Sequence, residues 1–162
     1  MAKKHIFFLL SLSALIVSCG LSKENRTSRK TINGTWELTK INYEGSQGYF
    51  KSTLFGDAKA QCFEGSEWYF LANNSTGYYD IPQKDDCFSG KRNIRWAVVD
   101  VNGTPSQFQF KFIDEKKKDI SGGYGYIFTI RSLTDTAMTV STDVNSEGEK
   151  VTVVYQFVRK SL

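Results

Sequence analysis

The chain has 162 residues, with 21 Lys and Arg against 17 Asp and Glu, for a formal net charge of +4. This length suits one domain with a substantial core. Residues 31–162 carry a net charge of −1. This balance excludes an extended phosphate-binding face, so the sequence predicts no nucleic-acid partner.

The first residues have the pattern of an export signal. Lys3 and Lys4 precede an apolar stretch over residues 6–17 that is too short to span a membrane. Residues 16–19, Ile-Val-Ser-Cys, resemble the bacterial lipoprotein signal, in which the cysteine becomes the lipidated first residue. We therefore expect a lipoprotein signal peptide at 1–18 and lipidation of Cys19. An ordinary export signal with a chance cysteine is the alternative.

The next segment, residues 19–30, is predicted to be a lipidated polar tether. Residues 20–30 carry a net charge of +3, which would attract anionic lipid headgroups. A merely soluble, flexible linker is an equally good interpretation. The lipid on Cys19 predicts a protein anchored to the bacterial cell envelope, on the periplasmic or the surface face of the outer membrane, and not one that spans it.

From Asn33 onward, aromatic and β-branched residues alternate with polar ones, which indicates β-strands. No segment of ten or more residues has a helical apolar stripe. We predict eight strands, near 34–43, 66–72, 76–82, 93–101, 106–113, 123–132, 136–143 and 150–159.

The connections between these strands differ in length. Residues 73–76, 102–105 and 133–136 are tight-turn sequences. The connections 44–65, 83–92, 114–122 and 144–149 are longer. In an antiparallel meander successive connections alternate between the two ends of the sheet, so the short turns lie at one end and the long connections at the other. The sequence thus predicts an all-β, eight-stranded antiparallel up-and-down barrel with one closed end and one mouth.

Barrel closure pairs the last strand with the first, so Trp36 and Arg159 meet at the closed end. Arg159 would cover the indole and keep its own charge near water. Gly34 would allow a tight entry into the first strand.

Gly34-Thr35-Trp36, with Arg159 on the last strand, resembles the glycine-any-tryptophan motif of the lipocalins and the arginine that packs across it. The resemblance is closest to the lipocalin-like domains of bacterial envelope lipoproteins. It implies a lipocalin-like β-barrel domain over residues 31–162, without the C-terminal helix of typical lipocalins. It also implies a small hydrophobic ligand.

Cys62 and Cys87 are predicted to form a disulfide, as expected in an oxidising compartment. If the turn is centred between Asn74 and Ser75, paired positions sum to 149. Phe70 then faces Tyr79, Trp68 faces Ile81, and the same register brings the two cysteines together at the mouth.

Catalytic groups are scarce. The one histidine, His5, lies in the expected signal peptide. Oxidised cysteines provide neither a thiol nucleophile nor a zinc site. The acidic neighbours at 85–86 and 114–115 are interpreted as loop-solvating residues, as is the lysine run at 116–118, for which an anionic ligand is the alternative. The sequence predicts no enzyme, no cofactor and no metal.

Two functions are possible, depending on whether side chains fill the barrel interior or leave room for a small ligand. Alternation points these side chains inward: Trp36, Leu38, Trp68, Phe70, Ile94, Trp96, Val98, Phe108, Phe110, Phe112, Tyr126, Phe128, Ile130, Met138, Val140, Val153, Tyr155 and Phe157. The ligand-binding candidates are Phe70, Trp96, Phe110, Tyr126, Phe128 and Tyr155.

The leading hypothesis is a monomeric, lipid-anchored protein that binds or carries a small hydrophobic or amphipathic molecule. The alternative is a filled barrel that serves as an envelope interaction module for a protein or a glycan, through residues 44–65 and 83–92. Tyr49, Phe50, Leu54 and Phe55 would then be an exposed patch, or a lid if they fold over the mouth.

Overall fold

The computed structural model describes residues 20–45, 53–84, 86–87, 90–146 and 148–161. The expected signal peptide and Cys19 lie outside these ranges, as do Tyr49 and Phe50. Within the ranges described, no helix has the length and apolar character needed to cross a membrane.

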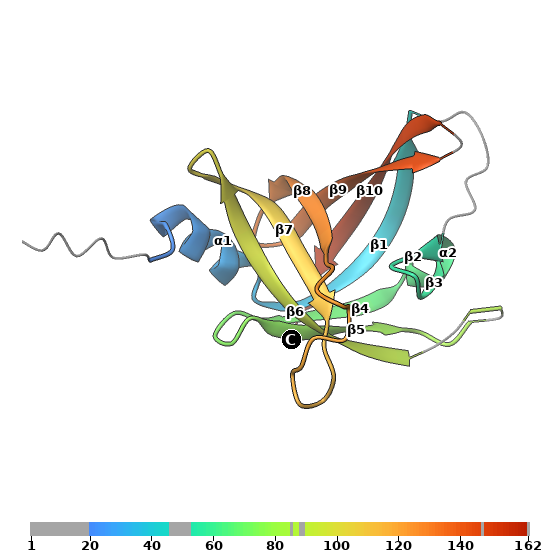
Figure 1. Cartoon of the computed structure of the whole chain (residues 1–162), viewed down its shortest axis with the longest axis horizontal. Helices are drawn as coiled ribbons and strands as arrows, with labels where there is room; N and C mark the ends of the chain where they lie inside the picture. The colour runs from blue at the N-terminus through green and yellow to red at the C-terminus, as the bar shows by residue number, and fades with distance from the viewer. Residues whose placement is uncertain (1–19, 46–52, 85, 88–89, 147, 162) are drawn as a thin grey trace, which may run out of the picture.

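Eight antiparallel strands close into one barrel in the order β1-β10-β9-β8-β7-β6-β5-β4, as predicted (Figure 1). Alternate side chains point inward, because successive residues of a strand face opposite sides of the sheet. The strands are β1 (Gly34–Glu44), β4 (Ser66–Leu71), β5 (Thr76–Ile81), β6 (Gly90–Val101), β7 (Thr104–Phe112), β8 (Tyr126–Leu133), β9 (Ala137–Ser146) and β10 (Glu149–Arg159).

The inward positions predicted from the alternation are confirmed. Every one of those side chains belongs to a single apolar cluster inside the barrel, with Phe112, Tyr126 and Ile130 only partly buried.

The alternation pattern did not reveal the ten-residue helix that the structure contains within the described residues. Helix α1 (Lys23–Ile32) begins after Ser22, whose side chain accepts a hydrogen bond from the Asn25 backbone N–H at 3.0 Å. Its buried side carries Asn25 as well as Ile32, so an apolar stripe is not the signal that marks it.

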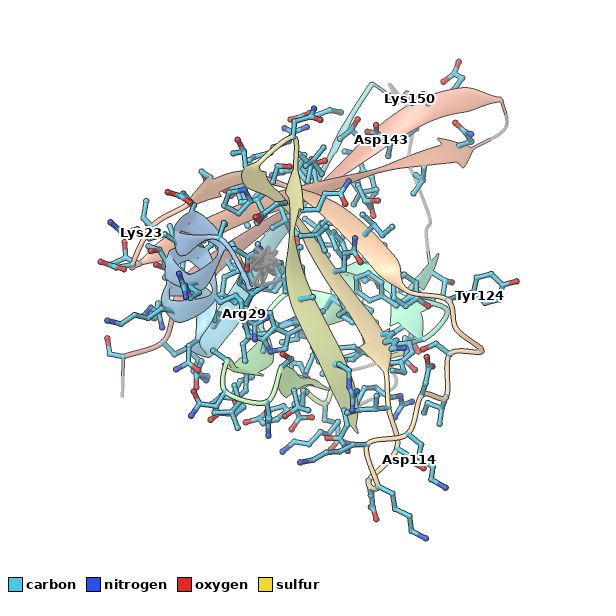
Figure 2. The ribbon with its side chains drawn as sticks, turned by 60° about the vertical axis from the view of Figure 1, so that its left-hand side comes forward. Lys23, Arg29, Asp114, Tyr124, Asp143 and Lys150 are labelled. Atoms are coloured by element: carbon cyan, nitrogen blue, oxygen red, sulfur yellow. A yellow bond between two sulfur atoms is a disulfide. The ribbon has the colours of Figure 1, made fainter. Side chains whose placement is uncertain are left out.

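Helix α1 packs across the closed end of the barrel (Figures 1 and 2). The Asn25 amide donates to the Val98 carbonyl at 3.0 Å and to the Asp100 carboxylate at 2.6 Å. The Arg29 guanidinium donates to the Ala72 carbonyl at 2.7 Å. The flexible-linker alternative is therefore wrong for residues 23–30, which are helical and fixed to the barrel by side-chain hydrogen bonds. The lipid anchor before them stays a prediction.

The predicted register of β4 and β5 is wrong by two residues. Phe70 lies opposite Gly77, and Trp68 lies opposite Tyr79. The strands stop at Leu71 and Thr76, so residues 72–75 form a four-residue turn where a two-residue turn was predicted. The disulfide forms nonetheless, because its cysteines lie beyond the paired parts of both strands.

The short connections lie at the closed end, as predicted. Asn102 and Gly103 have φ of 53° and 80°, and two consecutive positive φ values are typical of a type I′ hairpin turn. The prediction of a long connection at 144–149 is wrong, because β9 and β10 remain paired up to Ser146 and Glu149. Three long connections, and not four, lie at the mouth.

The first long connection holds the short elements β2 (Thr53–Leu54), β3 (Ala58–Lys59) and α2 (Ala60–Phe63). Strands β2 and β3 pair only with each other, in a two-stranded sheet separate from the barrel. Residues 53–59 are called the lid below, because they fold over the mouth.

Candidate functional site

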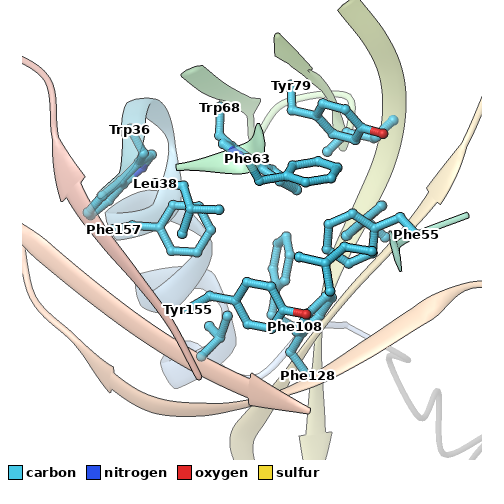
Figure 3. Close-up of a cluster of buried hydrophobic side chains, with 14 of the residues drawn as sticks. Trp36, Leu38, Phe55, Phe63, Trp68, Tyr79, Phe108, Phe128, Tyr155 and Phe157 are labelled. Atoms are coloured by element: carbon cyan, nitrogen blue, oxygen red, sulfur yellow. The ribbon is translucent and has the colours of Figure 1, made fainter. Parts of the chain in front are cut away.

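The ring of Phe55, at the tip of the lid, lies among the aromatic rings inside the barrel (Figure 3). Phe55 is 8% exposed, although it belongs to no barrel strand. Its ring centroid lies 5.0 to 6.4 Å from those of seven other rings, which are Phe63, Trp68, Tyr79, Phe110, Tyr126, Phe128 and Tyr155. Most of these contacts are edge-to-face, the arrangement that aromatic pairs favour.

Three hydrogen-bonding side chains of the barrel hold the polar groups of the lid. The Tyr126 hydroxyl donates to the Phe55 carbonyl at 2.6 Å. The Tyr79 hydroxyl donates to the Asp57 carboxylate at 2.7 Å. Arg92 donates two hydrogen bonds to the same carboxylate, at 2.9 and 3.2 Å. The lid thus places one ring, one carbonyl and one carboxylate in the mouth.

Both tyrosine hydroxyls are held in their protonated, donating form. Burial raises the pKa of Tyr79 far above its usual range, and the hydrogen bond to Asp57 raises it further. Burial also raises the pKa of Tyr126, with a smaller contribution from the Asp57 charge. At neutral pH the mouth therefore presents two hydroxyl donors beside one guanidinium.

The backbone of the lid is strained at its tip. Phe55 has φ of 56°, in the left-handed region that a bulky side chain seldom adopts. The cost of this conformation is about 1–2 kcal/mol. The contacts of the Phe55 ring outweigh this cost while the lid is closed.

The six ligand-binding candidates fall into two groups. Phe110, Tyr126, Phe128 and Tyr155 surround Phe55 at the mouth. Phe70 and Trp96 pack against each other, with ring centroids 5.5 Å apart. They lie nearer the closed end, where the guanidinium of Arg29 on α1 lies 4.8 Å from the Trp96 ring centroid.

The closed end brings together Gly34, Trp36 and Arg159. Trp36 is fully buried, and the Arg159 guanidinium lies 4.3 Å from its ring centroid. Arg159 also donates to the carbonyls of Asn33, at 2.8 Å, and Thr31. A Cβ on Gly34 would lie 2.7 Å from this guanidinium, so the glycine leaves room for the arginine. These residues have a structural role.

The predicted disulfide between Cys62 and Cys87 is confirmed, with a Cα–Cα distance of 5.6 Å. Cys62 lies in α2, directly after the lid, and Cys87 lies in the connection between β5 and β6. The bond therefore fixes the C-terminal side of the lid to the rim of the barrel.

The sequence analysis did not predict the site roles of four residues that form the mouth. They are Phe55, Asp57, Tyr79 and Arg92. The lid is too short to show a strand period, and the opposite charges of Asp57 and Arg92 are 35 positions apart. Phe55 was considered only as a patch or lid residue. The structure makes it a lid residue, and Leu54 is buried as well.

Solved structures similar in fold include two lipocalins. Bovine odorant-binding protein, solved with a selenium-containing odorant, is 14% identical, over 88% of this chain and 77% of that one, with a TM-score of 0.46. Lobster apocrustacyanin A1 is 11% identical, over 86% of this chain and 66% of that one, also with a TM-score of 0.46. No curated protein matches the chain in sequence.

The family model described as a lipocalin-like domain matches residues 32–140. The match begins at the end of α1 and extends from β1 into β9, so it includes the Trp36 motif, the lid and most of the barrel. Lipocalin-like barrels form a family that binds small hydrophobic ligands. By its sequence and its closed eight-stranded barrel, this chain belongs to the family of lipocalin-like domains.

Proposed function

We propose that this protein is a lipid-anchored, monomeric binding protein that holds a small hydrophobic or amphipathic molecule in the barrel mouth, in the space that Phe55 occupies. One observation carries the proposal. The ring at the centre of the mouth comes from a two-stranded hairpin outside the barrel ladder, so it can leave while all eight barrel strands remain paired.

The proposed role is binding without chemical change. Among the described residues, the barrel side chains that donate hydrogen bonds to the lid are Tyr79, Tyr126 and Arg92. Donors of this kind orient a guest. A general base or nucleophile is needed to transform one, and none of these three side chains is suited to that role at neutral pH.

The anchor is part of the same proposal. Lipid on Cys19 would stand four positions before Lys23, the first residue of α1, a reach of at most about 14 Å. Because α1 covers the closed end, the mouth would then face away from the bilayer. The groove beside α1 is lined by Arg26, Arg29 and Lys30, so positive charge would lie on the membrane side. The proposal includes a location at the bacterial outer membrane, which rests on the lipoprotein signal expected from the sequence.

A second candidate function is that of an interaction module with a filled barrel. An exposed apolar surface elsewhere on the barrel favours it. The connection between β7 and β8 exposes Tyr124 to 82% and Ile120 to 62% (Figure 2). Large exposed apolar side chains are typical of contact surfaces. The described residues of the first connection, Leu54 and Phe55, are buried, so the contact surface would lie on residues 113–125 instead.

The test compares wild type and Phe55→Ala, each purified without detergent from an oxidising envelope. Native and denaturing mass spectrometry would detect a bound molecule, and N-phenylnaphthylamine fluorescence would measure apolar binding. We expect a mass adduct that is lost on denaturation, and a stronger probe signal from Phe55→Ala. Tyr124→Ala is the control, because it removes an exposed ring outside the mouth.

If both proteins are bare and neither binds the probe, the binding function is refuted. A loss of partner binding in Tyr124→Ala would then identify the interaction module as the function.

A further inference from the structure

We propose that the lid imitates the natural ligand, and that this ligand is an aromatic carboxylate. The inference rests on the proposed binding function and gives it a ligand class. The lid is already bound in the mouth, and its chemistry is known from the sequence. A guest that displaces it has to satisfy the same barrel groups.

The apolar part of the imitation is the Phe55 ring. It has edge-to-face contacts with Phe63, Phe110 and Tyr126 at 5.0 to 5.2 Å, and it lies parallel to the Tyr155 ring at an interplanar angle of 24°. Edges on several sides and a face on another form a box that suits a flat ring. Aliphatic chains would fill the same volume without matching these contacts.

The polar part of the imitation consists of two hydrogen-bond acceptors of the lid that lie close to the Phe55 ring. The Phe55 carbonyl accepts from Tyr126, and the Asp57 carboxylate accepts from Tyr79 and Arg92. A guest without acceptors would lose these hydrogen bonds. The loss weighs most at Tyr79, which is fully buried, and less at Arg92, whose side chain is 35% exposed.

The spacing of the two parts sets the size of the guest. Phe55 and Asp57 are separated by one residue, so their Cα atoms are at most about 7 Å apart. An aromatic ring joined to a carboxylate by a short flexible link spans such a distance. Because a guanidinium is a cation, Arg92 favours a carboxylate over a neutral acceptor.

The lid is also built to be released. Its two strands make only the pairs Thr53 with Lys59 and Leu54 with Ala58. Its tip is strained at Phe55, and opening relieves that strain. The disulfide at Cys62 keeps the displaced lid beside the rim, which raises its effective concentration for reclosure.

The first test uses a matched pair of probes, naphthylacetate and the neutral naphthylethanol, which share a ring system and differ in the carboxylate. The protein is the double variant Phe55→Ala/Asp57→Asn, which removes both imitating side chains. Calorimetry should show naphthylacetate binding at least about tenfold tighter than naphthylethanol. Adding Arg92→Gln should abolish most of this preference.

Arg131→Gln in the same background is the matched control. Arg131 pairs with Glu44 at 2.8 Å and has a 36% exposed side chain, close to the 35% of Arg92 in its pair with Asp57. This control removes the same charge from elsewhere on the barrel. It should therefore leave the preference for the carboxylate unchanged.

The second test uses the wild-type chain, so it does not depend on the folding of a variant. Saturating naphthylacetate should speed amide hydrogen exchange in residues 53–59, because the lid is displaced. Naphthylethanol should do so far less. Unchanged exchange in the lid at saturation would overturn the imitation.

The remaining outcomes separate the two proposals. Equal affinity for both probes, or a preference that survives Arg92→Gln, refutes the carboxylate ligand and leaves the apolar binding function standing. If the folded double variant binds neither probe and the wild type shows no exchange change, both proposals are refuted.

Discussion

The disulfide supports a quantitative prediction about stability. The variant Cys87→Ala opens the covalent loop between Cys62 and Cys87, which have a sequence separation of 25 residues. Closing a loop of this length lowers the conformational entropy of the unfolded chain, and the chain-entropy relation gives about 3.5 kcal/mol at 25 °C. Alanine is chosen over serine because it adds no hydroxyl group. The remaining Cys62 thiol, which is 1% exposed, behaves as a small apolar group.

The assay is urea unfolding followed by tryptophan fluorescence, with oxidised wild type as the reference. We expect the variant to lose about 3.5 kcal/mol of unfolding free energy, and its melting temperature to fall by about 10 °C. Reductant should lower wild type to the level of the variant and leave the variant unchanged. A variant within about 1 kcal/mol of oxidised wild type would refute the entropic argument.

Three further predictions concern the barrel itself. Arg159→Met removes a guanidinium stacked on an indole together with its hydrogen bonds to backbone carbonyls, and should cost about 2–3 kcal/mol in urea unfolding; a loss below about 0.5 kcal/mol would contradict this role. Burial raises the pKa of Tyr79 and Tyr155 above the usual 10, so both stay protonated in the folded state. The contribution of these two tyrosines to the free energy of unfolding should therefore be fully present below pH 10 and be lost as the pH rises above it. Tyrosinate absorbance should then rise together with unfolding. Full ionisation of all tyrosines in a folded protein near pH 10 would disprove the shift. In Gly77→Ala the new Cβ would lie 2.0 Å from the Tyr69 carbonyl oxygen, and we expect a loss of more than about 2 kcal/mol, against which a near-neutral melting temperature would count.

The strands could be predicted because each alternates over most of its length. The inward set from Trp36 to Phe157 follows from a period of two, which the closed sheet imposes on every strand. The register of β4 and β5 could not be predicted in the same way. It depends on the turn at residues 72–75, where Ser75 adopts φ of 58°, and the local sequence also suits a shorter turn.

Helix α1 was missed for a different physical reason. Its attachment to the barrel relies on the hydrogen bonds of Asn25 and Arg29, and these side chains contribute nothing to an apolar period. Polar residues that pack by hydrogen bonding look like a solvated segment until their partners are known. Those partners, such as Val98 and Ala72, are more than forty positions away.

The candidate site was only half accessible to prediction. Alternation identified the barrel rings that surround the mouth, including Phe110 and Tyr155. It did not identify the ring at their centre, because Phe55 reaches the mouth through a two-stranded hairpin whose register has no repeat. Which of several loop aromatics enters a barrel depends on the lid geometry, and the sequence shows that geometry only weakly.

The pairing of the first barrel strand with the last has a consequence for how the chain folds. Trp36 pairs with Arg159 and Glu44 with Thr152, so closure requires contacts that span most of the sequence. Such long-range pairing slows folding. Until β10 is in place, the curved sheet has bare edges at β1 and β9, which are able to pair with other chains. The last eleven residues of the barrel (Glu149–Arg159) therefore remove both edges at once, and the risk of aggregation is greatest just before they dock.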